Sequence, residues 1–408
     1  MIFGNIIQKI GINFWNREKN CIFAVLNQTS ITMIKRELES LIAQKMFKGK
    51  AIIIIGARQV GKSTMMNQII KAYDTVKSVY LNCDEPEIKE ILSNANVNEL
   101  KTITAANKIM VIDEAQRVDN IGMTLKRLTD NFPDLQLLVS GSSSFDLQNK
   151  LDEPLTGRKF EYRLYPFSTH ELLDNNGLIY VKQTLENRLI YGSYPDVINH
   201  REDAKELLMN IAKSYLYKDI LMLDNIRKPA ILDKLLIALA LQVGSEVSNN
   251  ELAQTIGTDA KTAEKYIDLL EKCYIIFRLP AFNRNVRNEL KKGKKIYFYD
   301  NGIRNAVLQN FTPLAMRNDI GALWENFFIS ERIKYNSYRL TYAKSYFWRT
   351  TAQQEIDYIE ERDGVFTAFE MKYNPKKQTT AKIPSIFAET YALKESAIIT
   401  PENYLEYL

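Results

Sequence analysis

Eight residues, Gly56-Ala57-Arg58-Gln59-Val60-Gly61-Lys62-Ser63, constrain the fold of this chain more than any other segment. They match the pattern GxxxxGK[ST], and they lie between an apolar run at residues 51–55 and a stretch of helical character that begins at Thr64. Where a strand turns through glycines into a helix, backbone N–H groups and the helix N-terminus point to one place and bind phosphate there. The segment therefore predicts a parallel α/β sheet with a phosphate-binding loop after its first strand.

A second apolar run carries the acidic residues that such a loop needs. Residues 109–112 are Ile-Met-Val-Ile, and Asp113 and Glu114 follow directly. In nucleotide hydrolysis of this type a lysine reaches the β- and γ-phosphates, a serine and an aspartate hold Mg²⁺, and a further residue orients the attacking water. We expect Lys62 and Glu114 to be catalytic, Ser63 to hold Mg²⁺, and Asp113 to hold it through a water molecule. The ATP-binding residues would be Gly56, Ala57, Arg58, Gln59, Val60, Gly61, Lys62, Ser63 and Thr64.

Ser140 ends another apolar run, at residues 135–139, and precedes Gly141. At the end of a strand between the two motifs it would contact ATP and read the γ-phosphate. A serine before a glycine could equally be an ordinary turn residue. Both interpretations stay open.

Length and composition exclude several classes of protein. At about 100–200 residues per domain, the 408 residues predict between two and four domains. Hydrophobic residues make up 46% and charged residues 25%, so the chain is neither disordered nor collagenous. The net charge of +5 is too small to indicate a dedicated polyanion binder.

Cysteine and histidine content argue against a disulfide or zinc scaffold. The three cysteines lie far apart, and only His170 and His200 accompany them, so metal chemistry must rely on carboxylates. The apolar runs are much shorter than the roughly 20 residues of a membrane-spanning helix. We expect a cytoplasmic protein with no membrane partner.

Changes of pattern along the chain predict five regions. Residues 1–32 form an extension without clear periodicity, and we expect the folded protein to begin near Met33. Residues 33–160 alternate apolar runs with helical stretches, as an α/β domain does, and residues 161–228 are mostly helical, as in a lid or connector. Residues 229–317 show three helix patterns and two extended segments around a basic loop, which is typical of a winged helix-turn-helix. Residues 318–408 form the last domain.

Taken together, these motifs resemble the AAA+-like ATPases that carry a DUF4143 C-terminal region. The resemblance rests on the loop Gly56–Ser63, on Asp113-Glu114-Ala115-Gln116, on Ser140-Gly141-Ser142-Ser143, on Gly157-Arg158 before Leu164-Tyr165-Pro166-Phe167-Ser168, and on the C-terminal residues described below. It covers about residues 33–408 and implies a P-loop NTPase sheet of AAA+ type. It also implies a catalytic, charge-sensing role for Arg158, either in its own site or in that of a neighbouring subunit. A surface salt bridge is the alternative, and the oligomeric state stays open.

Asp363-Gly364 predicts a two-residue hairpin turn that sets the register of the strands on either side. If Arg362 pairs with Val365, then Asp357 faces Glu370 and Glu355 faces Lys372. These four would share one face, and Ile356, Tyr358, Phe369 and Met371 would share the other. Opposed carboxylates are destabilising unless a cation lies between them, and oxygen ligands suit Mg²⁺ or Mn²⁺.

With Glu325 on the preceding helix, this pattern is similar to the PD-(D/E)xK nuclease core. The resemblance implies a restriction-endonuclease-like α/β domain in which Asp357 and Glu370 bind the metal, Glu325 supports the metal site, and Lys372 activates water. Ile356 stands where that core often has proline. A charged, solvent-facing hairpin is the structural alternative.

The loop before the last domain is basic and could contact DNA phosphates, which position a protein without reading sequence. A solvated loop is the alternative. Its cationic residues are Arg284, Arg287, Lys291, Lys292, Lys294 and Lys295.

The sequence thus predicts an ATP-binding protein and Mg²⁺-dependent ATPase whose nucleotide state controls a winged-helix and nuclease-like C-terminal half that acts on DNA. In one alternative the C-terminal half binds a protein or nucleic acid without cleaving it. In the other, the chain is a metal-dependent nuclease that ATP merely regulates.

Overall fold

The computed structural model describes residues 33–141, 154–214, 229–283, 293–350, 352, 354–374, 376 and 383–408. The chain divides into two units, Met1–Ile34 and Lys35–Leu408, and the described helices and strands all belong to the second unit. The extension at residues 1–32 lies outside the described residues, so a folded start near Met33 stays a prediction. In the described parts of the chain, no helix is both long and apolar enough to cross a membrane.

The N-terminal part of the second unit is built on a five-stranded parallel sheet. Its strand order is β2-β3-β4-β1-β5. β4 therefore lies between β1, which precedes the phosphate-binding loop, and β3, which ends at Asp113. Three of the strands, β1, β3 and β4, are buried along their whole length, as the apolar runs predict. The strands are β1 (Ala51–Ile55), β2 (Ser78–Asn82), β3 (Ile109–Asp113), β4 (Gln136–Gly141) and β5 (Lys159–Arg163).

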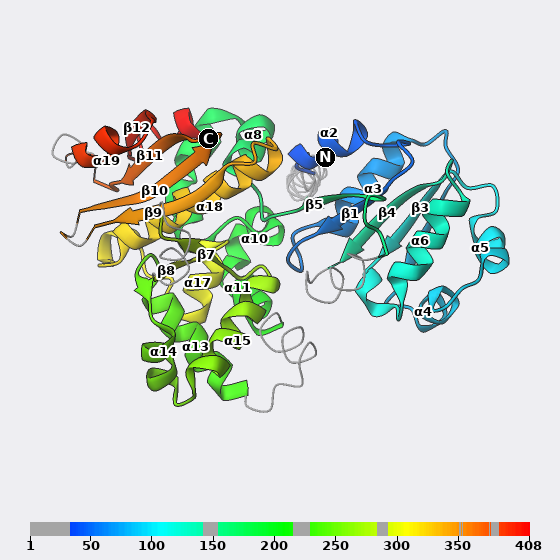
Figure 1. Ribbon diagram of the computed structural model, residues 1–408, viewed down its shortest axis with the longest axis horizontal. Helices are drawn as coiled ribbons and strands as arrows, with labels where there is room; N and C mark the ends of the chain where they lie inside the picture. The colour runs from blue at the N-terminus through cyan, green and yellow to red at the C-terminus, as the bar shows by residue number, and fades with distance from the viewer. Residues whose placement is uncertain are drawn as a thin grey trace, which may run out of the picture. The chain divides into compact units, whose positions relative to one another are not determined.

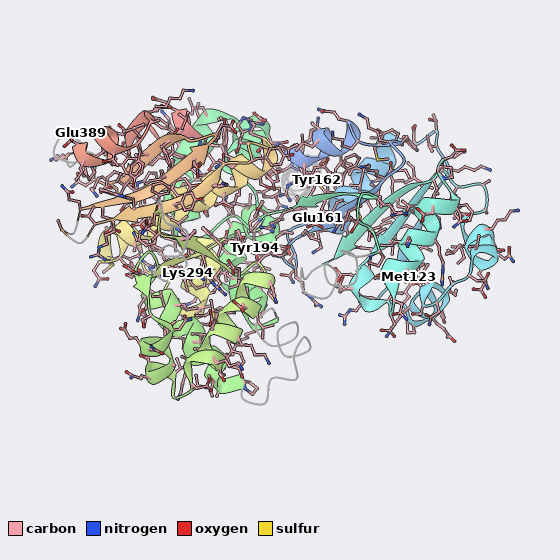
Figure 2. All side chains as sticks on the ribbon, viewed as in Figure 1. Met123, Glu161, Tyr162, Tyr194, Lys294 and Glu389 are labelled. Atoms are coloured by element: carbon pink, nitrogen blue, oxygen red, sulfur yellow. The ribbon has the colours of Figure 1, made fainter. Side chains whose placement is uncertain are left out.

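The fifth strand lies across the boundary expected at residue 160. β5 pairs with β1 in parallel and ends at Arg163, so the sheet extends into a region predicted to be mostly helical. Its sequence, Lys-Phe-Glu-Tyr-Arg, is that of a half-exposed edge strand: Tyr162 is buried while the neighbouring Glu161 is exposed (Figure 2). The sequence of β5 contains no apolar run, because only one face of this edge strand is buried.

Helices link the strands in the order that parallel pairing requires. α3 follows the loop directly, and α6 crosses the sheet in Figure 1. The helices of this part are α2 (Glu37–Ala43), α3 (Lys62–Ala72), α4 (Pro86–Leu92), α5 (Val97–Thr104) and α6 (Ile121–Asn131).

Helices follow β5 in the described residues of the region expected to be a helical lid or connector, and that role stays a prediction. The first of these helices is interrupted at Gly177, whose φ of 83° is not helical. The connector helices are α8 (Thr169–Gln183), α9 (Leu185–Tyr191), α10 (Pro195–Asn199) and α11 (Ala204–Ser214).

The middle region contains the three helices and two extended segments that the sequence predicts, together with the short strand β6 and the helix α17. Its strands form a three-stranded antiparallel sheet in the order β6-β8-β7. The winged-helix assignment itself stays a prediction. The elements are α13 (Pro229–Leu241), β6 (Glu246–Val247), α14 (Asn249–Ile256), α15 (Ala260–Lys272), β7 (Ile276–Pro280), β8 (Lys294–Phe298) and α17 (Asn301–Val307).

The C-terminal part packs a long helix against a four-stranded sheet of order β12-β11-β10-β9. Arg332 of the helix donates to both carboxylate oxygens of Glu360, at 2.9 and 2.6 Å, and both side chains are buried. The elements are α18 (Ile320–Tyr338), β9 (Lys344–Arg349), β10 (Glu355–Arg362), β11 (Val365–Met371), α19 (Ser385–Thr390) and β12 (Leu393–Ile399).

The hairpin register is confirmed for residues 358–362 of β10, but the predicted faces are partly wrong. Arg362 pairs with Val365, and Tyr358 with Phe369. However, the register against β9 shifts between Ile356 and Ile359. Ile356 therefore packs in the small apolar cluster of Trp348 and Phe387, whereas Tyr358, Phe369 and Met371 lie in the main core. A bulge of this kind inverts the alternation that a regular strand would keep.

Candidate functional site

The phosphate-binding loop and the end of β3 meet at one cleft of about 530 Å³. β1, which precedes the loop, and β3 are parallel and end at the same edge of the sheet, where ligands bind in such folds. Two lining residues, Pro195 and Asp196, come from α10 of the connector. The cleft is lined by Arg58, Gln59, Gly61, Lys62, Ser63, Thr64, Asp84, Glu114, Pro195 and Asp196.

Two glycines of the loop are required by its geometry. A Cβ on Gly56 would lie 2.2 Å from the carbonyl oxygen of Leu164. Gly61 has a φ of 93° and precedes the first residue of α3. The Nζ of Lys62 donates to the carbonyls of Gly56 and Ala57, at 3.0 and 2.9 Å, so the lysine folds over the loop that it serves.

Asp113 and Ser140 form a buried pair beside the loop. The Oγ of Ser140 donates to Oδ1 of Asp113, and it accepts the backbone N–H of Glu114 at 3.2 Å. Ser140 is the fifth residue of β4 and is fully buried. It therefore lies in a strand, and the turn interpretation is wrong.

Glu114 leaves the strand in an unusual conformation. Its φ of 54° and ψ of 40° are left-handed, which is costly for a residue with a side chain. Its carboxylate reaches the cleft and accepts Nε2 of Gln116 at 2.6 Å. Such backbone strain clusters at functional sites, and here it points the carboxylate into the cleft.

Arg158 is placed differently. Its Nε lies 2.6 Å from Oδ1 of Asp130, in an ion pair whose side chains are both 40% exposed, and Arg158 is not among the described residues that line the cleft. This is the surface salt bridge that the sequence left open. A charge-sensing role stays a prediction.

The groups at the cleft fit a nucleoside triphosphate with Mg²⁺. The site offers backbone N–H groups of a glycine loop and helix N-terminus, a lysine ammonium, a serine hydroxyl and two carboxylates, and these are the donors and acceptors that phosphates and Mg²⁺ need. Sequence reasoning missed four residues that no local motif marks. Arg36 donates to the carbonyl of Val60 in the loop, Tyr80 donates to Asp113, and Pro195 and Asp196 line the cleft.

A second cluster of charges joins β8, α18 and the hairpin. The Nζ of Lys295 lies 2.6 Å from Glu355 and 3.4 Å from Glu325, and Lys372 lies 2.6 Å from Glu370. Oδ2 of Asp357 accepts the backbone N–H of Met371 at 2.9 Å. In this cluster the charges of the carboxylates are therefore balanced by two lysines, Lys295 and Lys372.

Burial and mutual repulsion act on these carboxyl groups. Burial, with the charge of Asp357, raises the pKa of Glu325 to about 7. Burial likewise raises the pKa of Asp357 and Glu370. No group of three or more Asp, Glu, His or Cys side chains in the described residues could hold a metal ion. Metal binding by Asp357, Glu370 and Glu325, and water activation by Lys372, stay predictions.

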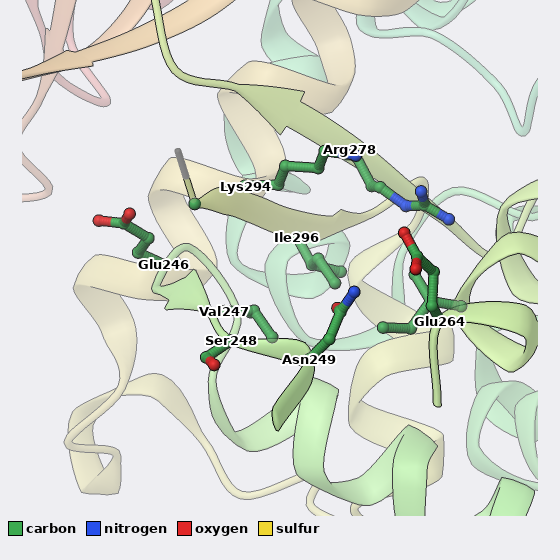
Figure 3. A pocket seen from close by; sticks show the side chains of 10 residues that line it. Glu246, Val247, Ser248, Asn249, Glu264, Arg278, Lys294 and Ile296 are labelled. Atoms are coloured by element: carbon green, nitrogen blue, oxygen red, sulfur yellow. The ribbon is translucent and has the colours of Figure 1, made fainter. Parts of the chain in front are cut away.

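The expected DNA-contacting loop is described only in part. Arg284, Arg287, Lys291 and Lys292 lie outside the described residues, and Lys295 is buried in the second cluster. A cleft of about 580 Å³ lies between α14, α15, β7 and β8, where Arg278 and Glu264 point toward one another (Figure 3). Arg278 forms ion pairs with Asp268 and, at 3.3 Å, with Glu271. The cleft therefore carries both signs of charge.

Three family models match separate parts of the chain. The model of an AAA domain (AAA_14) matches residues 48–173. Two domains of unknown function match the remainder: DUF8612 at residues 182–314 and DUF4143 at residues 320–406.

The chain is also similar to curated proteins whose names state no function. An uncharacterized protein of Mycobacterium tuberculosis is 24% identical over 378 residues, which are 91% of this chain and 80% of that protein. An uncharacterized protein of Haemophilus influenzae is 28% identical over 303 residues, covering 68% of this chain and 74% of the relative.

Among solved structures, a Walker-type ATPase of Pyrococcus abyssi is 16% identical, with a TM-score of 0.47, and covers 68% of this chain and 96% of that one. The AAA-domain match covers the part of the chain that forms the five-stranded parallel sheet and the phosphate-binding loop, and together they support a P-loop NTPase fold for that part.

Proposed function

We propose that the chain binds ATP with Mg²⁺ in the cleft above β1 and β3 and hydrolyses the ATP. The observation that carries the proposal is the convergence of Lys62, Ser63, Asp113 and Glu114 at one edge of a parallel sheet. Bound Mg²⁺ would neutralise phosphate charge there, held by Ser63 and Asp113.

The chain's own residues supply positioning and electrostatics. The loop N–H groups and the ammonium of Lys62 stabilise negative charge that develops on the phosphates. Lys62 reaches them by giving up its two loop carbonyls. Glu114 orients the attacking water, and Gln116, which donates to its carboxylate, holds it in place. Ser140 orients Asp113 and reads the γ-phosphate through that contact.

The first experiment compares wild type with Glu114→Gln in ATP binding and ATP turnover. The variant keeps the shape of the side chain but loses its charge, so we expect unchanged ATP affinity and turnover at least 100-fold slower. Glu161→Gln on the exposed edge of β5 is the matched control and should turn over normally. Normal turnover by Glu114→Gln would refute the assignment.

We further propose that nucleotide state controls the C-terminal half, which acts as a binding switch. Contacts that favour coupling join the loop to α18: Arg36 donates to the carbonyl of Val60 at 2.7 Å and to the hydroxyl of Tyr338 at 3.5 Å. The ion pairs of Lys295 with Glu355 and of Lys372 with Glu370 favour the switch over the nuclease. The lysines already neutralise carboxylate charge that a bound metal ion would otherwise neutralise. DNA and a protein remain the two candidate partners of this half.

The nuclease is tested by incubating linear and single-stranded DNA with Mg²⁺ or Mn²⁺, with and without ATP. We expect no cleavage by wild type under any condition. Cleavage that is lost in Asp357→Ala would establish the nuclease and overturn the switch without nuclease activity.

A further inference from the structure

A small cavity of about 60 Å³ lies among the helices that follow β5. Two of its lining residues are arginines and none is acidic. Thr184 and Arg188 are buried, whereas Asn187 and Arg201 are exposed, so the last two lie on the solvent side of the cavity. The cavity is lined by Thr184, Asn187, Arg188, Tyr191, Gly192, Val197, Ile198, Arg201 and Ala204.

The guanidinium of Arg188 has uncharged oxygens as its hydrogen-bond partners among the described residues. Arg188 is only 1% exposed. Its Nη1 donates to the hydroxyl of Thr169 at 2.7 Å, and its Nη2 donates to the carbonyl of Val181 at 3.0 Å and to the hydroxyl of Tyr404 at 3.1 Å. Its Nε is buried and has no hydrogen-bond partner in the part of the chain that the structure describes. One N–H donor of a buried cation is therefore left for a ligand.

Three other buried arginines each form an ion pair with a carboxylate. These pairs are Arg36 with Glu171, Arg304 with Asp319 and Arg332 with Glu360. Arg188 differs from these three, because its partners carry no charge.

The buried carboxylates around Arg188 have other partners. The backbone N–H of Thr169 donates to Glu331 at 2.6 Å, but Glu331 forms its ion pair with Lys334, at 2.7 Å. A second buried carboxylate of this region, that of Asp300, accepts two backbone N–H groups, at 2.7 and 3.2 Å. Neither carboxylate accepts a hydrogen bond from the guanidinium.

A counter-charge for Arg188 would be strongly stabilising. A guanidinium stays protonated in proteins, and a buried charge is costly unless an opposite charge and hydrogen bonds compensate it. The ring of Phe327, whose centre lies 5.3 Å from Cζ of Arg188, offsets only part of this cost. An anion in the cavity would supply both the opposite charge and an acceptor for Nε.

We propose that this cavity is a binding site for a small carboxylate anion. Arg188 donates to the carboxylate from the buried side and Arg201 from the solvent side, while Val197 and Ile198 enclose a short apolar end. The size of the cavity sets the ligand class, since pockets for drug-sized ligands are roughly 300 Å³ or larger. The cavity therefore admits a molecule such as acetate and excludes a nucleotide or a peptide segment.

The carboxylate site is separate from the ATP cleft. α10 contributes Val197 and Ile198 to the cavity and Pro195 and Asp196 to the cleft, but no residue lines both. Carboxylate binding therefore stands whether or not the chain binds ATP.

The test is saturation-transfer difference NMR on the full chain with acetate, acetamide and pivalate at equal concentration and equal ionic strength. Acetamide has the shape of acetate without its charge, and pivalate has the charge with a larger apolar end. We expect a methyl signal from acetate that is at least severalfold stronger than that from either control. Equal signals from acetate and acetamide would overturn the inference, because a cavity that holds only water does not distinguish them.

Variants distinguish the cavity from the protein surface. Ala204→Leu places a larger apolar side chain at the cavity wall and should abolish the acetate signal. Arg201→Gln should weaken acetate binding about fivefold, since Arg201 is exposed and its charge is screened. Lys205→Gln removes an exposed cation that is not among the residues lining the cavity, and it should match wild type. Equal affinities of the Arg201→Gln and Lys205→Gln variants would contradict the site.

A further measurement reports on Arg188 itself in the folded protein. The Nε–H resonance of Arg188, identified as the one missing from Arg188→Lys, should shift in the ¹H–¹⁵N spectrum of wild type as acetate is added and should stay in place as acetamide is added. A resonance that acetate leaves unmoved would overturn the role of Arg188.

Discussion

Replacing Arg36 by methionine should destabilise the chain far more than replacing Arg339, a more exposed arginine that pairs with the neighbouring Glu37. Arg36 and Glu171 form an ion pair at 2.8 Å whose side chains are 4% and 0% exposed. The guanidinium also donates to the carbonyls of Val60 and Tyr165, at 2.7 and 2.5 Å. Methionine replaces only the aliphatic stem of the arginine side chain and loses all of these donors.

The magnitude depends on the charge that the substitution leaves buried. Breaking a buried ion pair on one side costs about 3–5 kcal/mol, because the remaining charge stays buried without its partner. Glu171 would keep the backbone N–H groups of Glu37 and Ser168, at 3.1 and 2.9 Å, which places the cost near the lower limit. At a slope of about 2–3 kcal/mol per molar urea, the unfolding midpoint falls by about 1 M or more.

The assay is urea unfolding followed by circular dichroism, with Arg339→Met as the control. Arg339 pairs with Glu37 at a similar distance, 2.9 Å, but is 39% exposed, so its loss should cost less than about 1 kcal/mol. Adding Glu171→Leu to Arg36→Met should recover part of the loss, because it removes the stranded carboxylate. Equal midpoints for the two single variants would refute the reasoning from burial.

Two further predictions concern the loop and acid stability. Gly56→Ala should weaken ATP binding at least tenfold in an equilibrium titration, since its methyl group would meet the carbonyl of Leu164; an unchanged affinity would show that the loop adapts. Burial opposes ionisation of Asp319, but hydrogen bonds from Arg317 and Arg304 lower its pKa to about 2. Its stabilising effect is therefore present above the unfolded value of about 4 and is lost as the pH falls toward 2. Asp319→Asn should reduce the acid sensitivity of the melting temperature between pH 5 and 2, whereas Asp363→Asn at the exposed hairpin turn should not.

Local chemistry determines the parts of the fold that the sequence predicts. The loop at Gly56–Ser63 and the carboxylates at the end of β3 are set by neighbours in the chain, and the structure brings the loop and Glu114 to one cleft. The hairpin register is equally local, because Asp363 and Gly364 both adopt positive φ, 52° and 80°, as a tight turn of this kind requires.

The features that the sequence did not predict depend on partners far along the chain. β5 pairs with β1, and its five residues alternate charged and aromatic side chains instead of forming the apolar run that marks the buried strands. Arg36 looks like one more charge beside an amphipathic helix, yet its partners are Val60, Tyr165, Glu171 and Tyr338. The bulge in β10 arises from its pairing with β9. The turn at Asp363-Gly364 sets only the pairing of β10 with β11, so it cannot predict the bulge.

Arg36 also shows why the loop and α18 should respond together. A guanidinium has five N–H donors, and four contacts of Arg36 use its three nitrogens: Glu171, the carbonyl of Val60, the carbonyl of Tyr165 and the hydroxyl of Tyr338. Tyr338 is also bonded by the backbone N–H of Tyr165, at 3.2 Å. Because the group is rigid, planar and buried, a nucleotide that shifts Val60 must either break one of these bonds or move Tyr338 with it. In either case the contacts between the loop and α18 differ between the nucleotide-free and nucleotide-bound states. Such a difference is the physical requirement for coupling between two sites.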